Sequence, residues 1–206
     1  FHSDPKQFYT NIENLKANKY LHLIDLFVWG SPCQNLSLAG NRKGFNGEKS
    51  SLFREGARVQ AEMMPPNFIF ENVLGLLSSN NGDDYEEVCD TFRNQGYHIA
   101  LVKMNTKDYG VPQNRGRIFI VGFLDVNEYH NFKVPEPFIL ETRLKDILEQ
   151  EVDEKYFLSE EMIEKFTSGA DQLNPDYKSQ GNTVHDIEKV SPTLCAANHG
   201  YAQGYI

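Results

Sequence analysis

The chain has 206 residues, 40% of them hydrophobic and 12% aromatic, which is enough apolar material for a core and excludes a disordered protein. No run reaches the roughly 18 apolar residues that a membrane span requires, no signal peptide opens the sequence, and the three cysteines give neither a metal spacing nor a paired framework. The net charge of −9 argues against a nucleic-acid partner, yet residues 1–123 carry 13 basic and 13 acidic side chains and are neutral overall. The excess of acidic side chains lies in residues 124–206, which carry 7 basic and 16 acidic side chains. Screening limits the reach of distant charge to about 8 Å, so a local basic cluster in the first part could still contact phosphates.

Strand-like and helix-like segments alternate as far as Phe123. Strands are expected at His22–Trp29, Asn67–Val73, Tyr97–Met104 and Ile118–Phe123. Amphipathic helices are expected from Ser50 or Ser51 to about Met64, and from Gly82 to Gln95 with Asp83 or Asp84 as the cap. Cys89 lies on the apolar stripe of the second helix, so we expect a core thiol there. The alternation predicts a layered α/β sheet, whose last two strands could form an antiparallel pair.

The pattern changes after Phe123. A linker-like Val134–Pro137 is followed by two possible short helices, Thr142–Gln150 and Ser159–Thr167, a loop-like Ser168–Asn182 and a possible strand at Val190–Ala196. We therefore expect an α/β domain over residues 1–123, a linker over 124–140 and a second, smaller domain over 141–206.

A cysteine turn follows the first predicted strand. In Gly30-Ser31-Pro32-Cys33, the glycine and the proline end the strand, which puts Cys33 at a carboxyl end, where open α/β sheets bind ligands. A cysteine beside free backbone N–H groups could act as a thiolate nucleophile. Taken alone, the pattern fits a buried cysteine in a tight turn better than a nucleophile.

Two other charged sites fall at strand ends. Glu71 ends the strand after Phe68-Ile69-Phe70, and Arg115 and Arg117 lead into the last strand at a spacing that points both side chains the same way. Each could also be an ordinary surface charge. Between the cysteine and the first helix, Gly40–Gly47 is a basic, glycine-rich loop, but it lacks the Gly-Lys-Ser/Thr of a nucleotide-binding P-loop.

Three blocks together resemble a known family. Gly30-Ser31-Pro32-Cys33-Gln34, Phe70-Glu71-Asn72-Val73 and the run from Asp108-Tyr109-Gly110 through Pro112-Gln113-Asn114-Arg115-Gly116-Arg117 are similar, in order and spacing, to the signature blocks of the DNA (cytosine-5) methyltransferases. Ser191-Pro192-Thr193-Leu194 resembles the Thr-Leu of that family's target-recognition domain. The resemblance implies a Rossmann-like S-adenosylmethionine-dependent methyltransferase sheet, incomplete here, with a small partial recognition domain.

The resemblance also implies roles. Cys33 would be the nucleophile that adds to C6 of cytosine, Glu71 the group at N3, Arg117 the group at O2, and Arg115 its neighbour. Residues matching the positions that hold S-adenosylmethionine are Asn11, Ile12, Pro32 and Leu52. Residues matching those that face DNA are Gln34, Ser37, Arg42, Lys43, Lys49, Thr193 and Leu194. The target cytosine would be flipped out of the double helix.

The family's Phe-x-Gly-x-Gly cofactor turn and its closing block are absent, so we expect an internal fragment that is inactive alone. The implied partner is double-stranded DNA, with a cognate restriction endonuclease as a possible second partner. We expect a monomer that binds no metal and no membrane, in the cytoplasm of a bacterium or phage-infected cell, or at the nucleoid. Two alternatives stay open: a truncated protein that binds DNA without catalysis, and an RNA cytosine-5 methyltransferase on the same scaffold.

Overall fold

The computed structural model describes residues 11–32, 50–167, 184–193 and 204–205. The chain divides into two compact units. One contains Phe1–Met104 and Gly116–Pro135, and the other contains Asn105–Arg115 and Glu136–Ile206. The domain boundaries expected from the sequence stay predictions.

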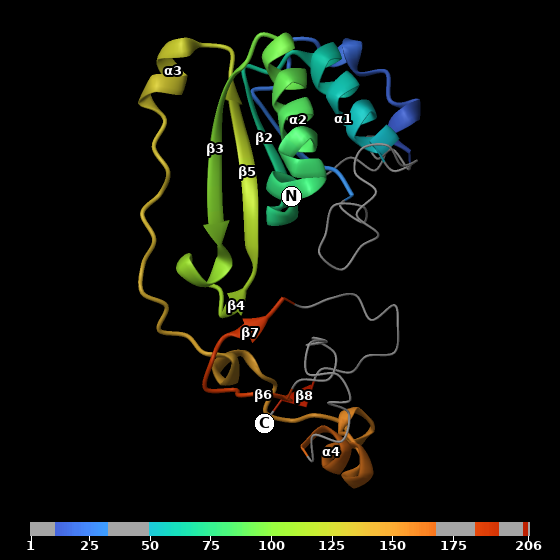
Figure 1. Ribbon diagram of the computed structural model, residues 1–206, viewed down its shortest axis with the longest axis vertical. Helices are drawn as coiled ribbons and strands as arrows, with labels where there is room; N and C mark the ends of the chain where they lie inside the picture. Colours follow the sequence, from blue (N-terminus) through green and yellow to red (C-terminus); the bar gives the residue numbers. More distant parts are fainter. Residues whose placement is uncertain (1–10, 33–49, 168–183, 194–203, 206) are drawn as a thin grey trace. The chain divides into compact units, whose positions relative to one another are not determined.

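The first unit is built on a four-stranded sheet with the strand order β1-β2-β5-β3 (Figure 1). The strands are β1 (Leu26–Gly30), β2 (Asn67–Val73), β3 (His98–Asn105) and β5 (Gly116–Phe123). β1 and β2 are parallel, whereas β2 and β5 are antiparallel. The expected α/β sheet is confirmed, and β2 has the predicted bounds.

The predicted first strand begins too early. His22 has a positive φ of 57°, and the Leu23 N–H donates to the Tyr20 carbonyl at 2.9 Å, so these residues form a turn. Pairing with β2 begins only at Leu26, opposite Asn67. The apolar run alone does not reveal this turn, because Leu23 and Ile24 extend the run ahead of Leu26.

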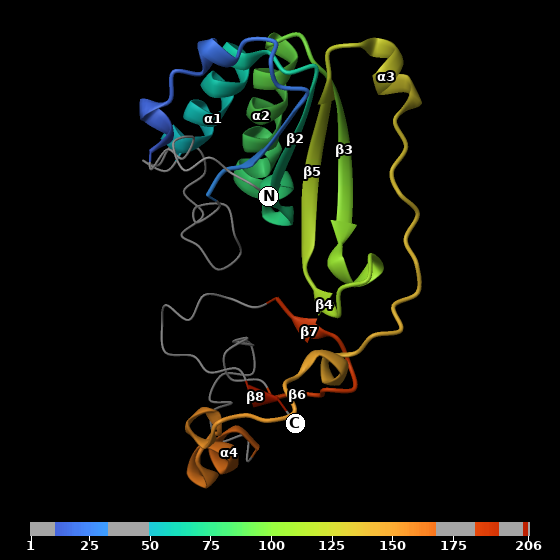
Figure 2. The same ribbon diagram turned by 180° about the vertical axis from the view of Figure 1, so that it is seen from behind.

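Two helices lie on the same side of the sheet (Figures 1 and 2): α1 (Ser50–Met63) and α2 (Asp83–Asn94). Phe53 of α1 and Phe92 of α2 pack on Phe68 and Phe70 of β2, and all four side chains are at most 2% exposed. The predicted stripe of α2 is confirmed, with Cys89 fully buried in this core. Alternate β2 residues point into the core because side chains on a strand alternate between faces.

The expected cap of α2 is wrong. Gly82 occupies the N-cap position with a φ of 99° and offers no side chain. Asp84 is buried and accepts a hydrogen bond from the Ser79 hydroxyl, so its carboxylate serves the preceding 3₁₀ segment, Leu74–Gly82. Glycine is well suited here because the left-handed conformation costs it little.

Close packing at Gly122 leads to a prediction of stability. A Cβ built on Gly122 of β5 would lie 2.0 Å from Cε1 of the buried Phe68 ring. Gly122→Ala is therefore expected to lower the free energy of unfolding by about 1–3 kcal/mol, the usual cost of overpacking. Chemical denaturation measures the loss, with Lys103→Ala on the exposed side of β3 as the control. Equal stability of Gly122→Ala and wild type would show that this contact is loose.

A second apolar cluster covers the opposite face of the sheet. Val102, Val121 and Phe123 are buried there, with Tyr129 and Phe132 packed against them. Tyr129 belongs to α3 (Val126–Asn131), a helix that the sequence analysis missed. The signal was present, because the Asp125 side chain caps this helix by accepting from the Asn127 N–H at 2.7 Å.

The second unit consists of short elements: β4 (Gln113–Asn114), α4 (Glu160–Thr167), β6 (Val184–His185), β7 (Ser191–Pro192) and β8 (Gly204–Tyr205). β4 pairs in parallel with β7, and β6 with β8.

The helix predicted over Thr142–Gln150 is wrong: only a 3₁₀ turn forms, at Leu144–Ile147. There the Leu144 N–H donates to the Lys189 carbonyl at 3.0 Å, so this stretch is tied to a distant segment. The predicted helix Ser159–Thr167 is confirmed as α4. The whole loop predicted at 168–182 and part of the strand predicted at 190–196 lie outside the described residues.

Across the helices of the described part of the chain, none is long and apolar enough to span a membrane.

Candidate active site

The strand directions bring three predicted site segments to one edge of the sheet. The carboxyl ends of the parallel strands β1 and β2 share that edge, and the antiparallel β5 begins there. In the register, Gly30 lies opposite Glu71, and Val73 lies opposite Arg117. Glu71 and Arg117 alternate with residues buried under the helices, so both side chains project from the opposite face.

Glu71 and Arg117 form an ion pair. Arg117 Nε lies 2.8 Å from Glu71 Oε1, and the side chains are 17% and 36% exposed for Arg117 and Glu71 respectively. Arg117 Nη1 also donates to the Gly116 carbonyl at 2.8 Å. The guanidinium is thus held from two sides, while the carboxylate keeps access to solvent. Both residues were predicted from the sequence, but their contact was not.

Gly30 leaves room for the carboxylate. A Cβ on Gly30 would lie 3.2 Å from Glu71 Oε2 and 3.1 Å from the Glu71 carbonyl oxygen. A side chain at this position would push on Glu71. The glycine of the cysteine turn, read in the sequence as a strand breaker, therefore also shapes the surroundings of Glu71.

A buried hydrogen bond ties the start of the cysteine turn to β2. Asn72 Nδ2 donates to Ser31 Oγ at 3.2 Å, and Asn72 Oδ1 accepts from the Val73 N–H at 2.8 Å. Both side chains are buried polar groups. Pro32, which follows, is exposed. The chain is therefore anchored beside Glu71 two residues before Cys33, which itself lies outside the described residues.

The residues predicted to hold S-adenosylmethionine lie in separate elements of the first unit. Asn11 is exposed and caps the 3₁₀ turn Ile12–Asn14: its Oδ1 accepts from the Glu13 N–H at 3.0 Å, and its Nδ2 donates to Glu13 Oε2 at 3.0 Å. Ile12 is half-buried against the cluster of Ala17, Val59 and Met63. Leu52 is half-buried near the start of α1.

The second unit holds Arg115 and Thr193. The Arg115 N–H donates to Asn105 Oδ1 at 3.0 Å, and Thr193 Oγ1 donates to the Asn114 carbonyl at 2.9 Å. The predicted recognition segment is therefore bonded to the Gln113-Asn114 block through both β7 and Thr193. The other residues predicted to face DNA, Gln34, Ser37, Arg42, Lys43, Lys49 and Leu194, lie outside the described residues.

Cys89 is a poor candidate for a nucleophile. Its thiol is fully buried, and burial raises its pKa. A raised pKa lowers the thiolate fraction at neutral pH. Cys195 lies outside the described residues, and within the described ranges no three His, Cys, Asp or Glu side chains gather as a metal site would require.

Comparisons with known proteins agree on one family. The model of the C-5 cytosine-specific DNA methylases matches residues 2–199. Type II methyltransferase M.Bsp6I of Bacillus sp. is 34% identical over 90% of this chain and 61% of its own length, and orphan methyltransferase M.SPRI of Bacillus phage SPR is 33% identical over 85% and 46%. The chain spans about half the length of the curated relatives it matches.

Solved structures share the fold. The Entamoeba histolytica methyltransferase EhMeth aligns with a TM-score of 0.64 at 14% identity, over 89% of this chain and 53% of its own. The Dnmt2 methyltransferase of S. pombe aligns with a TM-score of 0.61 at 20% identity, over 96% and 60%. The sheet thus has the fold of these methyltransferases. Because the family model matches residues 2–199 of this chain of 206 residues, the chain belongs to the C-5 cytosine-specific DNA methylases.

Proposed function

We propose that this chain carries the chemistry of a DNA (cytosine-5) methyltransferase, which transfers a methyl group from S-adenosylmethionine to C5 of a flipped-out cytosine. The observation that carries the proposal is the Glu71–Arg117 ion pair, at the strand edge from which the chain leads to Cys33. A carboxyl group and a guanidinium side by side suit a ring that presents N3 and O2 next to each other.

The proposed roles follow from the chemistry of cytosine. C5 is a weak nucleophile, and addition of the Cys33 thiolate at C6 forms an S–C bond and makes C5 electron-rich. Negative charge then shifts toward N3 and O2. The Glu71 carboxylate would take up a proton from water when cytosine binds and share it with N3, while Arg117 donates hydrogen bonds to O2. Once C5 carries the methyl group, loss of the C5 proton and of the thiolate restores the aromatic ring. Arg115 is proposed as a neighbouring contact.

The described residues suit S-adenosylmethionine in part. Ile12, Leu52 and Pro32 are apolar groups of the kind that pack on adenine and on an aliphatic chain, and the first two are only half-buried. Asn11 already bonds Glu13 through both side-chain polar atoms, so its backbone is the better candidate for a contact. When bound, the cofactor would supply an electrophilic methyl group.

DNA binding is proposed for two segments, the stretch that follows Cys33 and the stretch around Thr193. Gln34, Ser37, Arg42, Lys43 and Lys49 would face the double helix or its phosphates, and Thr193 and Leu194 would read sequence. Flipping the cytosine out of the stack costs a few kcal/mol, which contacts with the emptied helix would offset. A monomeric state and a cognate restriction endonuclease are proposed from family membership alone.

The test is methyl transfer to DNA and to tRNA side by side. With labelled S-adenosylmethionine, the protein expressed from its complete gene is expected to label cytosine C5 in double-stranded DNA and to leave tRNA unlabelled. Heat-inactivated protein is the control. Label in tRNA alone would favour an RNA methyltransferase, and DNA binding without label would indicate a non-catalytic DNA-binding protein.

A further inference from the structure

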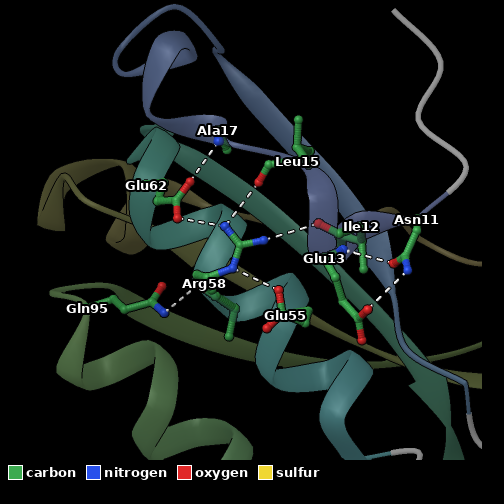
Figure 3. A network of polar contacts seen from close by, with 10 residues as sticks. Asn11, Ile12, Glu13, Leu15, Ala17, Glu55, Arg58, Glu62 and Gln95 are labelled. Atoms are coloured by element: carbon green, nitrogen blue, oxygen red, sulfur yellow. Dashed lines mark hydrogen bonds and ion pairs between the residues drawn. The ribbon is translucent and has the colours of Figure 1, made fainter.

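The segment that carries Asn11 and Ile12 is held in place by hydrogen bonds with helix α1. It consists of two 3₁₀ turns, Ile12–Asn14 and Ala17–Tyr20, and belongs to no sheet. Short 3₁₀ turns have few hydrogen bonds of their own. The position of the segment therefore depends on α1, against which it lies (Figure 3).

Arg58, on α1, makes two hydrogen bonds to the backbone of this segment. Its Nη2 donates to the Ile12 carbonyl at 3.1 Å, and its Nη1 donates to the Leu15 carbonyl at 3.1 Å. The two acceptors lie three residues apart, so a single planar guanidinium spans the first turn (Figure 3).

Two carboxylates of the same helix orient the guanidinium. Glu55 accepts from Arg58 Nε at 2.8 Å, and Glu62 accepts from Arg58 Nη1 at 2.6 Å. The other oxygen of Glu62 accepts from the Ala17 N–H at 2.7 Å, so the same network also bonds the second turn, Ala17–Tyr20. These hydrogen bonds raise the pKa of Arg58 and, through Arg58 and then Ala17, lower that of Glu62, so both groups are charged at neutral pH.

We propose that Arg58 is a positioning residue for the cofactor, because it fixes the turn that presents Asn11 and Ile12. This inference rests on the proposed function. In the described part of the chain, the hydrogen bonds of Arg58 go to this segment and to its own helix, and none goes to the Glu71–Arg117 pair. Loss of Arg58 should therefore weaken cofactor binding and spare the chemical step. Lysine keeps the charge but cannot reproduce the planar fork that reaches both carbonyls.

The experiment compares Arg58→Lys with wild type in the protein expressed from its complete gene. Calorimetry with S-adenosylhomocysteine is expected to show binding about tenfold weaker for Arg58→Lys, the effect of losing one charge-assisted hydrogen bond. KM for S-adenosylmethionine should rise in parallel, with kcat at saturating cofactor nearly unchanged. Hydrogen exchange of the Leu15 and Ala17 amides should become faster.

Arg54→Lys is the matched control. Arg54 lies one turn earlier on α1, is 68% exposed and pairs only loosely with Glu87, at 3.8 Å, so cofactor affinity should not change. Glu62→Gln is the second variant: it keeps an acceptor for the Ala17 N–H but loses the ion pair with Arg58, so its affinity should fall between those of wild type and Arg58→Lys.

The outcomes separate the two proposals. If wild type binds and transfers methyl groups but Arg58→Lys binds the cofactor equally well, the inference is wrong and the proposed function stands. A parallel fall of kcat and thermal stability, with unchanged affinity in both Arg58→Lys and Glu62→Gln, would show a purely structural role. If wild type neither binds S-adenosylhomocysteine nor methylates DNA, the proposed function fails and takes the inference with it.

Discussion

Cys33→Ser is expected to abolish methyl transfer to DNA while leaving DNA binding largely intact. The reaction needs an anionic sulfur to add to C6 of cytosine, and an alcohol is far less ionised than a thiol at neutral pH. The exchange of sulfur for oxygen hardly changes the size of the side chain, so the fold should survive. Transfer of label from S-adenosylmethionine measures the loss, and an electrophoretic mobility shift measures binding.

Cys89→Ala is the matched control, since Cys89 lies in the core and should contribute only to stability. DNA that contains 5-fluorocytosine gives an independent readout. Fluorine at C5 blocks the final elimination, so wild type and Cys89→Ala should be trapped covalently and Cys33→Ser should not. An adduct mapped to Cys89 or Cys195 would refute the assignment of Cys33.

The sequence predicted which helices and strands form better than the residues at which they begin and end. The strand Asn67–Val73 and the stripe of α2 could be read directly, because both are continuous apolar patterns with breakers on each side. The start of β1 and the cap of α2 could not. They depend on the positive φ of His22 and on the hydrogen bond that the Ser79 hydroxyl donates to Asp84. A hydrophobic pattern contains no information on either feature.

The site shows the same division. Glu71 and Arg117 were predicted from their chemistry and from the family's blocks, but not their contact. Their contact follows from the antiparallel register of β2 and β5, in which Arg117 lies diagonally across from Glu71. Gly30 and Arg58 were not predicted as site residues at all. The contact of Gly30 and the proposed role of Arg58 depend on neighbours 41 and 46 residues away in sequence, Glu71 and Ile12, and no short motif links such positions.

The strand order gives the cysteine turn its setting. Because β1 and β2 are parallel and β5 runs against them, one sheet edge receives the ends of two strands and the beginning of a third. Gly30 and the Ser31–Asn72 hydrogen bond then fix the approach of the chain to Cys33 relative to Glu71. We infer that the proposed catalytic residues depend on β1–β2 packing for their alignment.

Glu71→Gln is expected to lower the rate of methyl transfer by a factor of about 10²–10⁴, the usual contribution of a positioned proton donor. Glutamine keeps the shape of the side chain and can still accept from Arg117, but it cannot hold an exchangeable carboxyl proton at N3. Single-turnover rates at saturating DNA measure the chemical step. Glu87→Gln is the matched control, because Glu87 also pairs with an arginine, yet at 3.8 Å on the exposed surface of α2.

Arg117→Lys, combined with Glu71→Gln, tests whether the two side chains act as a unit. Lysine keeps a positive charge but lacks the planar guanidinium, which contacts Glu71 Oε1 and donates to the Gly116 carbonyl at the same time. If the pair works jointly on N3 and O2, the double variant should be little slower than the slower single variant, because either change alone already removes part of the same joint contact with the ring. Additive losses would mean that Glu71 and Arg117 act independently, and a Glu71→Gln rate within a few-fold of wild type would remove the carboxyl group from the mechanism.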